Sequence, residues 1–536
     1  MIKETCFLLI IFCFSSNLFG QAAKEVIDDV PASLAATITV EDLKTHLNTL
    51  ASDEYEGRET GTVGNEKAGI YIANHFEQLG LPPIGNDESY YQNVMFTWTM
   101  WKDISISIKK ADKEEKFRHL REFLSFPTRN GEMPALKTDE IVFLGYGIDD
   151  SKYSDYRGKD LKGKVIMVYK GEPFDKKGKS RITGTTTPSK WTTSWEEKLK
   201  TAHEKGVKAV LFIENNLQKE ISENRRFLVG PKLTLGEQDQ PETQYANSCY
   251  ISTNIAQAII GKNLKKVKKA RKKIRKRGKS KSVTLPVNFE LVQTKNVRTL
   301  AGNNVLGYIE GNDPKLKEEL VIITAHYDHL GKRGDDIFNG ADDNGSGTSS
   351  VLEVAEAFAK AQQQGLGPRR SVLCMLVTGE EKGLLGSQFY AENPIFPIEN
   401  TIANVNVDMV GRVDEKYADN PNYVYVIGSD RLSTELHDIN ENVNKTYTNL
   451  VLDYTYNADD DPNRYYYRSD HYNFAEKGIP AIFYFNGTHK DYHRTTDTVE
   501  KINFEKMAII AKLVFHTAWQ LANQDKRIEV NVTGRN

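Results

Sequence analysis

Five short segments in the carboxyl-terminal half of the chain place acids or histidines beside an apolar run or in a glycine-rich turn. Their side chains are His326, Asp328 and His329 after VIITA, Asp342 and Asp343 in NGADDNGSG, Glu380 and Glu381 after MLVTG, Asp408 after VNV, and His493 with Asp497 in DYHRTTDT. That many carboxylates in one place cannot all stay ionised without cations. Imidazoles and carboxylates without a thiolate suit zinc or a similar divalent ion, and a carboxylate shared by two ions defines a two-metal site.

These side chains can meet only if the elements that carry them end at one place. From about residue 285 onward, apolar runs typical of strands alternate with helical patterns. The expected strands are NNVLGYIEG, ELVIITAHYDHL, SVLCMLVTGEE, NTIANVNVDMVG, NYVYVIGS and PAIFYFNG, and the expected helices lie near 347–363, 383–392, 431–444, 469–477 and 504–523. Continuously apolar strands indicate a mostly parallel sheet with helices on both faces, a three-layer α/β domain. Open sheets of this class place their sites at the carboxyl ends of the strands.

Taken one at a time, these residues have ordinary interpretations. A lone histidine at a strand end is more often a satisfied polar group than a ligand, and an aspartate in a glycine-rich turn is usually a turn cap. A calcium loop is excluded because its D-x-[DN]-x-[DN]-G register does not fit residues 335–347. A serine hydrolase is disfavoured because no G-x-S-x-G elbow is present, and the consecutive Ser469, Asp470 and His471 cannot form a triad. The joint order of the motifs is what indicates a metal site.

Composition and charge describe a soluble globular protein, and the first residues indicate export. The formal net charge is -2 and 27% of residues are charged, which gives no case for nucleic acid as a partner. Residues 1–20 combine a lysine, an apolar run and small or polar residues before Gln21, as in a secretory signal peptide, so we expect export to the periplasm or the medium. No later run is long and apolar enough to span a bilayer. Cys249 and Cys374 fall in different predicted domains, so no disulfide is expected.

At 536 residues the chain is too long for one ordinary core, so we expect a domain that carries an insertion. Two amphipathic helices around a turn rich in Gly, Glu and Thr begin the mature chain, and short alternating strands follow. The predicted boundaries are 1–20 for the signal peptide, 35–130 and 285–525 for the two parts of the main domain, 131–284 for a strand-rich insertion, and 526–536 for a tail.

The insertion ends in the strongly basic stretch KNLKKVKKARKKIRKRGKSKS. Such a stretch could bind an acidic polymer or anionic lipid. Leu264, Val267, Ala270 and Ile274 recur at helical spacing, however, which indicates an amphipathic helix with a solvated cationic face. The periodicity favours this second interpretation.

The motifs AHYDH, NGADDNGSG, TGEEKGLLGS, NVDM, SDHYNFAEKGIPA and DYHRTTDT together resemble those of the co-catalytic zinc aminopeptidases, a family that includes bacterial leucyl aminopeptidases and, more distantly, glutamate carboxypeptidase II, the transferrin receptor and glutaminyl cyclases. The stretch at 50–81 resembles the amino-terminal helices of that family, and 131–284 resembles its inserted protease-associated domain. The resemblance covers nearly all of the mature chain.

The resemblance implies two zinc ions and a role for each motif. The implied ligands are His326 and Asp408 for one zinc, Glu381 and His493 for the other, and Asp342 as the bridge. Glu380 would be the general base, and Asp328 would orient the ring of His326. Tyr466 falls where some members place an oxyanion-stabilising phenol, although the flanking cysteines of those members are absent. A cis peptide bond is expected after the bridging aspartate, between Asp342 and Asp343.

The expected function is removal of amino-terminal residues from peptides that have a free N-terminus. A water whose pKa is lowered by the zinc ions would lose its proton to Glu380 and attack the scissile carbonyl. The alternatives on the same scaffold are a carboxypeptidase, a glutaminyl cyclase or a non-catalytic receptor-like protein; the complete ligand set disfavours the last two. The loop NADDDPNRYYYRSDH either walls the substrate pocket or is a solvated turn, and the sequence leaves side-chain specificity and oligomeric state open.

Overall fold

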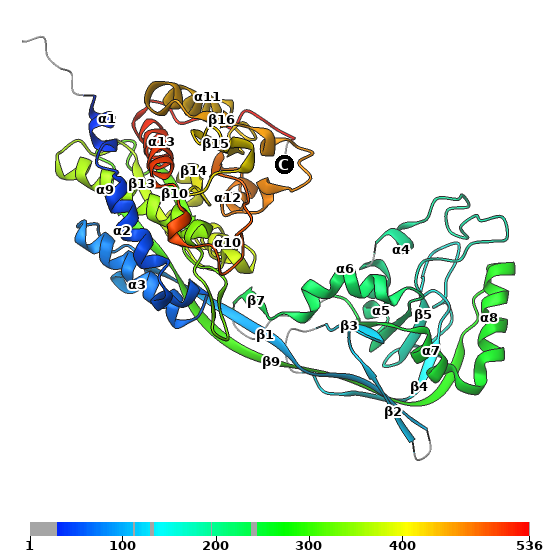
Figure 1. The fold of residues 1–536 in the computed structure, drawn as a ribbon. Coiled ribbons are helices and arrows are strands. Elements are labelled where there is room, and N and C mark those ends of the chain that lie inside the picture. Colours follow the sequence, from blue (N-terminus) through cyan, green and yellow to red (C-terminus); the bar gives the residue numbers. More distant parts are fainter. Residues whose placement is uncertain (1–28, 111–112, 129–132, 195, 237–243, 535–536) are drawn as a thin grey trace, which may run out of the picture. The chain divides into compact units, whose positions relative to one another are not determined.

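The chain forms two compact units. The structure, a computed structural model, describes residues 29–110, 113–128, 133–194, 196–236 and 244–534, so the expected signal peptide lies outside the described residues. Unit 1 comprises Met1–Asn93 and Gly302–Asn536, and unit 2 comprises Val94–Ala301. Unit 2 is therefore wider than the insertion expected over 131–284. The reason is that most of β1 (Tyr91–Lys110) and β9 (Val283–Ile309), two long strands, belongs to unit 2 (Figure 1).

The sheet of unit 1 is mixed and mostly parallel, as expected. Its strands run in the order β16 (Val451–Asp453), β15 (Tyr423–Ile427), β17 (Ala481–Phe485), β14 (Thr401–Val407), β10 (Leu320–His326), β13 (Ser371–Val377) and the end of β9. The central strands β13, β10, β14 and β17 pair in parallel, whereas β15 is antiparallel to β17 and β9 is antiparallel to β13. A hairpin of β11 (Gly331–Arg333) and β12 (Asp336–Phe338) follows β10.

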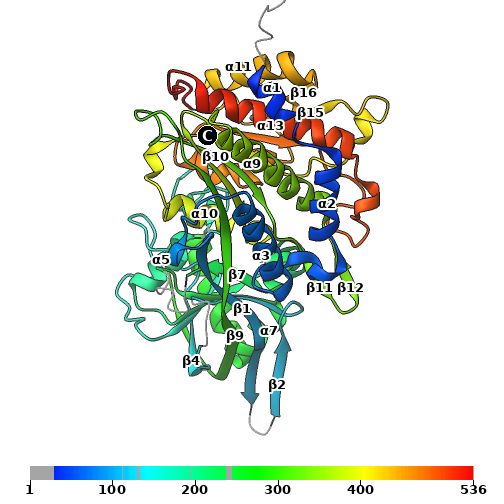
Figure 2. The same cartoon turned by 90° about the vertical axis from the view of Figure 1, so that its left-hand side faces the viewer.

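Helices cover both faces of this sheet, which makes unit 1 the expected three-layer α/β domain. One face packs against α9 (Gly347–Gln363) and α13 (Phe504–Asn523), joined by α1 (Val30–Ala35), α2 (Val40–Leu50), α3 (Val63–Gln78) and α11 (Thr434–Val443) (Figure 2). The other face packs against α10 (Leu385–Glu392) and α12 (His471–Glu476). All five helices expected after residue 340 are present.

The alternation of side chains along β10 shows why the strands read as continuously apolar. Val321 and Ile323 belong to the core cluster shared with α9 and α13. Leu320 and Ile322 belong to the opposite cluster, with Tyr390 of α10 and Phe474 of α12. A strand with helices on both faces buries every side chain, so no polar alternation remains in the sequence.

Unit 2 has its own sheet and its own cores. The strand order is β9, β4 (Leu136–Phe143), β5 (Val165–Tyr169), β6 (Ala209–Ile213), β8 (Asn247–Ile251) and β3 (Phe123–Phe126), and β1 pairs with β2 (Lys113–Arg118) and β7 (Lys232–Leu235). Its helices are α4 (Lys190–Thr193), α5 (Glu196–Glu204), α6 (Leu217–Val229), α7 (Thr253–Ile260) and α8 (Leu264–Arg277). Cys249 in β8 and Cys374 in β13 are buried and free, so the expectation of no disulfide between them is confirmed.

Candidate metal centre

The acids and histidines singled out in the sequence gather at the carboxyl edge of the unit 1 sheet. His326 is the last residue of β10, and the turn Glu380–Lys382 follows β13. Asp408 follows β14 directly, and the segment after β17 carries His493. The turn Ala341–Ser346 supplies the remaining carboxylate as it leads into α9. Because β13, β10, β14 and β17 are parallel, their ends share one edge, as the sequence predicts.

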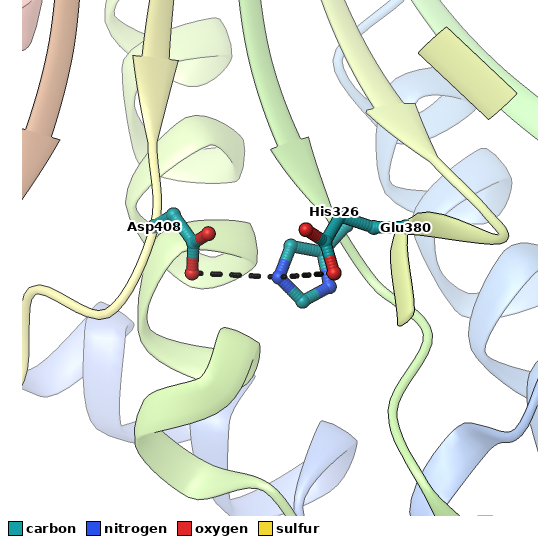
Figure 3. Close-up of side chains that lie close together, drawn as sticks. All are labelled: His326, Glu380 and Asp408. Carbon is teal, nitrogen blue, oxygen red and sulfur yellow. Dashed lines mark ion pairs between the residues drawn. The ribbon is translucent and has the colours of Figure 1, made fainter. Parts of the chain in front are cut away.

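One group of potential ligands surrounds the ring of His326. Its Nε2 lies 3.4 Å from Oδ1 of Asp408 and 3.8 Å from Oε2 of Glu380 (Figure 3). Oδ1 of Asp343 lies 3.5 Å from the same nitrogen. Three carboxylates from three different elements therefore face one imidazole nitrogen.

A second group surrounds Glu381. Its Oε2 lies 3.3 Å from Nε2 of His493, and its Oε1 lies 2.9 Å from Nδ1 of His329. Oδ2 of Asp343 lies 3.1 Å from Nε2 of His493 and 3.7 Å from Nδ1 of His329. Asp343 thus presents one oxygen to each group and lies between them.

The expectation that Asp342 lies between the groups is wrong by one residue. The carboxylate in that place belongs to Asp343, and the cis peptide bond joins Asp343 to Asn344 rather than Asp342 to Asp343. Neither of the two groups of potential ligands includes Asp342. The sequence therefore predicted the correct turn, but the wrong one of its two adjacent aspartates was expected to face the histidines.

Asp342 points into the scaffold behind the centre. Its Oδ1 accepts a hydrogen bond from the backbone N–H of Gly411 at 2.7 Å, and its Oδ2 lies 3.2 Å from Nε2 of His489. Oδ2 of Asp497 in turn accepts the backbone N–H groups of Asp342 at 3.0 Å and Asp343 at 3.1 Å. The backbone on both sides of the Asp342–Asp343 bond is therefore held by fixed partners, which aim the two side chains in different directions.

His329 is a residue of the centre to which the sequence assigned no role. It is fully buried, and its ring faces Glu381 and Asp343. Its position three residues after His326, beyond the end of β10, is the only sequence sign that it could reach the site. Because the chain turns at that point, His326 and His329 reach different groups.

Asp328 supports the centre differently from the expectation. Its backbone carbonyl, not its carboxylate, is the partner of Nδ1 of His326, at 3.0 Å against 3.9 Å for the nearer carboxylate oxygen. The carboxylate instead accepts the backbone N–H of Glu380 at 3.1 Å and the hydroxyl of Thr60 at 2.8 Å. Asp328 therefore anchors the turn that carries Glu380.

Tyr466 does not line the cavity beside the two groups. The cavity is lined, besides the potential ligand residues, by Met409, Tyr465, Arg468, Phe483, Phe485, Thr488 and Tyr492. The ring of Tyr466 packs instead under the guanidinium of Arg431, 4.3 Å from ring centroid to Cζ. Residues Tyr465–Tyr467 form a single 3-10 turn, in which successive side chains point about 120° apart, and Tyr465 is the one of the three that lines this cavity.

Charges in the centre compensate one another. Burial lowers the pKa of His326, but the carboxylates around it, Glu380 first, outweigh burial and leave that pKa well above its usual value. Burial raises the pKa of Glu380 well above its usual range. Burial likewise lowers the pKa of His493, and hydrogen bonds to Asp343 and Glu381 more than reverse this and raise the pKa to about 10. Without another cation, the centre therefore holds protons to offset its carboxylates.

The residues present fit divalent metal ions. The buried atoms of the two groups that lack a hydrogen-bond partner among the described residues are His329 Nδ1 and Nε2, Asp343 Oδ2, Glu381 Oε1 and Asp408 Oδ1. Buried polar atoms without partners are costly, and here they are nitrogen and oxygen atoms of the kind that bind zinc. Within each group, potential ligand atoms from three residues lie within 4.8 Å of one another.

Arg58 links the segments that carry the ligands. It is 1% exposed, and its guanidinium donates to four backbone carbonyls: Tyr327 at 2.8 Å, Asn339 at 2.7 Å, Gly340 at 2.9 Å and Leu50 at 2.5 Å. Burial lowers its pKa to about 10, which leaves it protonated at neutral pH. The sequence indicated only a turn between two helices here, because acceptors more than 250 positions away leave no local pattern.

Comparison with known proteins agrees with this geometry. Residues 304–518 match the model of Peptidase family M28. The matched stretch contains every residue of the two ligand groups and all of β10, β13, β14 and β17. The matched stretch does not include unit 2, Val94–Ala301, so the match gives no information about that unit.

Proteins that are similar to this stretch carry names of the same kind. A "Probable leucine aminopeptidase" of Trichophyton verrucosum is 32% identical over 216 residues, which cover 39% of this chain and 56% of the relative. A "Probable zinc metalloprotease" of Pyrenophora teres is 28% identical over 280 residues, covering 43% and 53%. The chain thus spans about half the length of the curated relatives it matches. The solved aminopeptidase from Aneurinibacillus sp. strain AM-1 shares the fold, with a TM-score of 0.51 and 20% identity over 93% of this chain and 98% of that one.

The Arg58 contacts predict a stability effect. We expect Arg58→Met to lower the free energy of unfolding by about 2–4 kcal/mol, because it leaves three buried carbonyls and one partly buried carbonyl without their donor. Arg58→Lys should recover only part of the loss, since an ammonium cannot reproduce the fork of a guanidinium. Urea denaturation followed by circular dichroism measures both. Arg121→Met, at an exposed arginine, is the control, and equal stability of Arg58→Met and Arg121→Met would contradict the assignment.

Proposed function

We propose that the protein is a zinc-dependent aminopeptidase. The observation that carries the proposal is the position of Asp343, with one oxygen toward His326 and the other toward His493. The match of residues 304–518 to Peptidase family M28 and the names of the relatives support the same activity. The signal-like residues 1–20 support export, and the compact unit 2 is our candidate for a protease-associated domain.

We propose that the centre holds two zinc ions. His326 and Asp408 would hold one, Glu381 and His493 the other, and Asp343 would bridge them. Four carboxylates, those of Asp343, Glu380, Glu381 and Asp408, lie among the two groups, so two divalent cations would balance their charge. His329 also faces the second ion position, beside Glu381.

Glu380 is the proposed general base. Zinc bound in this centre would polarise the scissile carbonyl and lower the pKa of a water. The carboxylate of Glu380 belongs to the first group, but the proposed ligand sets do not require it, so it would be free to accept a proton from that water. It would then pass the proton to the leaving amine. Asp328 holds the backbone of Glu380 by accepting its N–H.

The cavity walls bear on which end of a peptide is bound. The loop at 457–471 contributes Tyr465 and Arg468, which supports the interpretation that it walls the pocket. Arg468 is exposed and lies 5.0 Å from the ring centroid of Tyr465. Because a guanidinium at the cavity could bind a substrate carboxylate, carboxypeptidase activity is the second candidate.

A substrate panel separates these activities. We expect hydrolysis of leucyl p-nitroanilide and of peptides with a free N-terminus, and none of N-acetyl-leucyl p-nitroanilide. Cleavage of N-blocked dipeptides that end in a free acidic residue would favour the carboxypeptidase instead. Cyclisation of amino-terminal glutamine would favour a glutaminyl cyclase. Activity that survives a chelator would overturn the metal mechanism altogether.

The assignment of the bridge predicts a contrast between two neighbouring residues. Asp343→Asn should bind substantially less zinc than the unaltered protein, because it removes charge from both ligand groups. Asp342→Asn should retain close to normal zinc, because Asp342 faces Gly411 and His489 instead. Metal analysis after dialysis measures both, with circular dichroism as the check on folding. The reverse pattern would restore Asp342 as the bridge.

The base assignment predicts a loss of turnover without loss of metal. Glu380→Gln should lower kcat for leucyl p-nitroanilide by about 100- to 10,000-fold, the usual contribution of general acid-base catalysis. Its zinc content should match that of the unaltered protein. Glu392→Gln, at an exposed glutamate on α10, is the matched control. Near-normal kcat in Glu380→Gln would assign the proton transfer to another group.

A further inference from the structure

The basic stretch of unit 2 concentrates positive charge. Residues 262–281 contain 13 of the chain's 71 lysines and arginines and none of its 73 acids. The formal charge of the whole chain is -2, so the remainder of the chain carries -15. None of these cations belongs to the metal centre of unit 1, so the proposed peptidase activity does not account for this basic segment.

The structure shows which face of this segment is free. Helix α8 buries Val267, Ala270 and Ile274 in unit 2, which confirms the amphipathic helix expected from the periodicity. Twelve of the 13 cations are exposed, and Lys273 is half-buried. Arg271 lies over the ring of Tyr169, with Cζ 4.4 Å from the centroid. The apolar stripe is therefore occupied within unit 2, and the cationic face points to solvent.

No carboxylate of the described residues forms an ion pair with this face. The ion pairs of neighbouring lysines in unit 2, such as Lys170 with Glu214 and Lys190 with Glu197, show that acids are available elsewhere on the unit. At the carboxyl end of α8 another cation contacts the helix: Nη2 of Arg181 donates to the backbone carbonyls of Arg275 at 2.8 Å and Lys276 at 3.2 Å. Arg181 therefore extends the positive surface.

This charge arrangement opposes the helix that carries it. Cations four residues apart repel one another on a helix, and the pairs on α8 are Lys265 with Lys269, Lys268 with Lys272, Lys269 with Lys273, Arg271 with Arg275, Lys272 with Lys276, and Lys273 with Arg277. Lys265 and Lys266 also lie in the first turn, where the helix dipole disfavours positive charge. A surface of anions lying along the helix would relieve both repulsions.

The residue types indicate what kind of anion. Ten of the 13 cations are lysines, which act as point charges and do not fork around individual phosphates as arginine does. The segment 262–281 has no aromatic residue on which nucleic-acid bases could stack. A lysine-rich helix face that presents many charges in one plane suits an extended anionic lipid surface.

We propose that the cationic face of α8 binds the surface of a membrane that contains anionic lipid. The contact is peripheral, because Val267, Ala270 and Ile274 are already buried in unit 2 and cannot insert into the bilayer. Leu264, which is 41% exposed at the start of the helix, is the one apolar side chain of α8 available to the lipid interface. Among the described residues, no helix is long and apolar enough to cross a bilayer.

Vesicle binding by the full chain tests this directly. We expect the protein to sediment with vesicles of phosphatidylcholine mixed with phosphatidylglycerol, and at least about ten-fold less with phosphatidylcholine alone. The bound fraction should fall as salt rises, because screening weakens contacts between exposed charges. Equal binding to both vesicles, binding unaffected by salt, or no binding would each overturn the proposal.

Matched variants locate the binding surface. Five glutamine substitutions remove charge from α8 with little change in helix propensity; they are at Lys265, Lys268, Lys269, Lys272 and Lys276. The control variant has the same net charge and carries glutamine at five exposed lysines elsewhere: Lys137, Lys190, Lys205, Lys219 and Lys315. We expect the α8 variant to lose at least about ten-fold in vesicle affinity and the control to lose much less. Equal losses would show that only net charge matters.

Single-stranded DNA and heparin are the competing anions in the same assay. At equal salt, tighter binding of either than of the phosphatidylglycerol vesicles would assign the surface to a soluble polyanion and overturn the membrane proposal. The salt titration of the unaltered protein does not depend on how the α8 variant folds. Hydrolysis of leucyl p-nitroanilide by the α8 variant, together with its circular dichroism, checks the integrity of the chain independently of lipid binding.

Discussion

One carboxylate, that of Asp343, lies between two histidine-bearing groups, and much of unit 1 can be understood from what keeps it there. Its backbone N–H is held by Asp497. The carbonyl of Gly340, just upstream, is held by Arg58. The adjacent Asp342 is turned away by the N–H of Gly411 and by His489. The position of Asp343 therefore depends on a polar scaffold of backbone groups and buried side chains as much as on the ligands it faces.

The carboxylates of the centre repel one another, so keeping them together requires both fixed positions at the edge of the sheet and nearby positive charge. The strands β10, β13 and β14 are buried along their whole lengths, so the residues that follow them start from fixed positions. A dense core transmits such positions with little freedom. Without another cation in the centre, the pKa values of Glu380 and His326 are both strongly raised, so bound protons offset part of the negative charge of the carboxylates. Divalent cations would replace those protons and pair the unpartnered atoms of Asp343 and Glu381 at the same time.

Unit 2 contains a second cluster of charges, the lysines and arginines of α8, which are positive and exposed rather than negative and buried. The acids of unit 1 are buried and face histidines, whereas the cations of α8 are exposed and face solvent. Exposed like charges cost little each in water, but their sum along one helix is unfavourable to the helix. In both units the informative feature is a cluster of like charges.

The sequence by itself determined the layers of unit 1 and the identity of nearly all the acids and histidines in the centre. Runs of apolar residues and helical spacing report burial directly, and parallel strands bring His326, Glu381 and Asp408 to one edge whatever the details of the loops. It also determined that 264–277 is an amphipathic helix. These features follow from periodicity, which depends only on local geometry.

Only the tertiary structure decided which of two adjacent aspartates faces the histidines, that Tyr465 rather than Tyr466 lines the cavity, and that Arg58 joins distant loops. Neighbouring residues in an irregular turn point in directions set by its backbone angles, and those angles are fixed by partners such as Asp497, more than 150 positions away. Spacing along the chain carries no record of such partners, because it is the packed fold that brings them together.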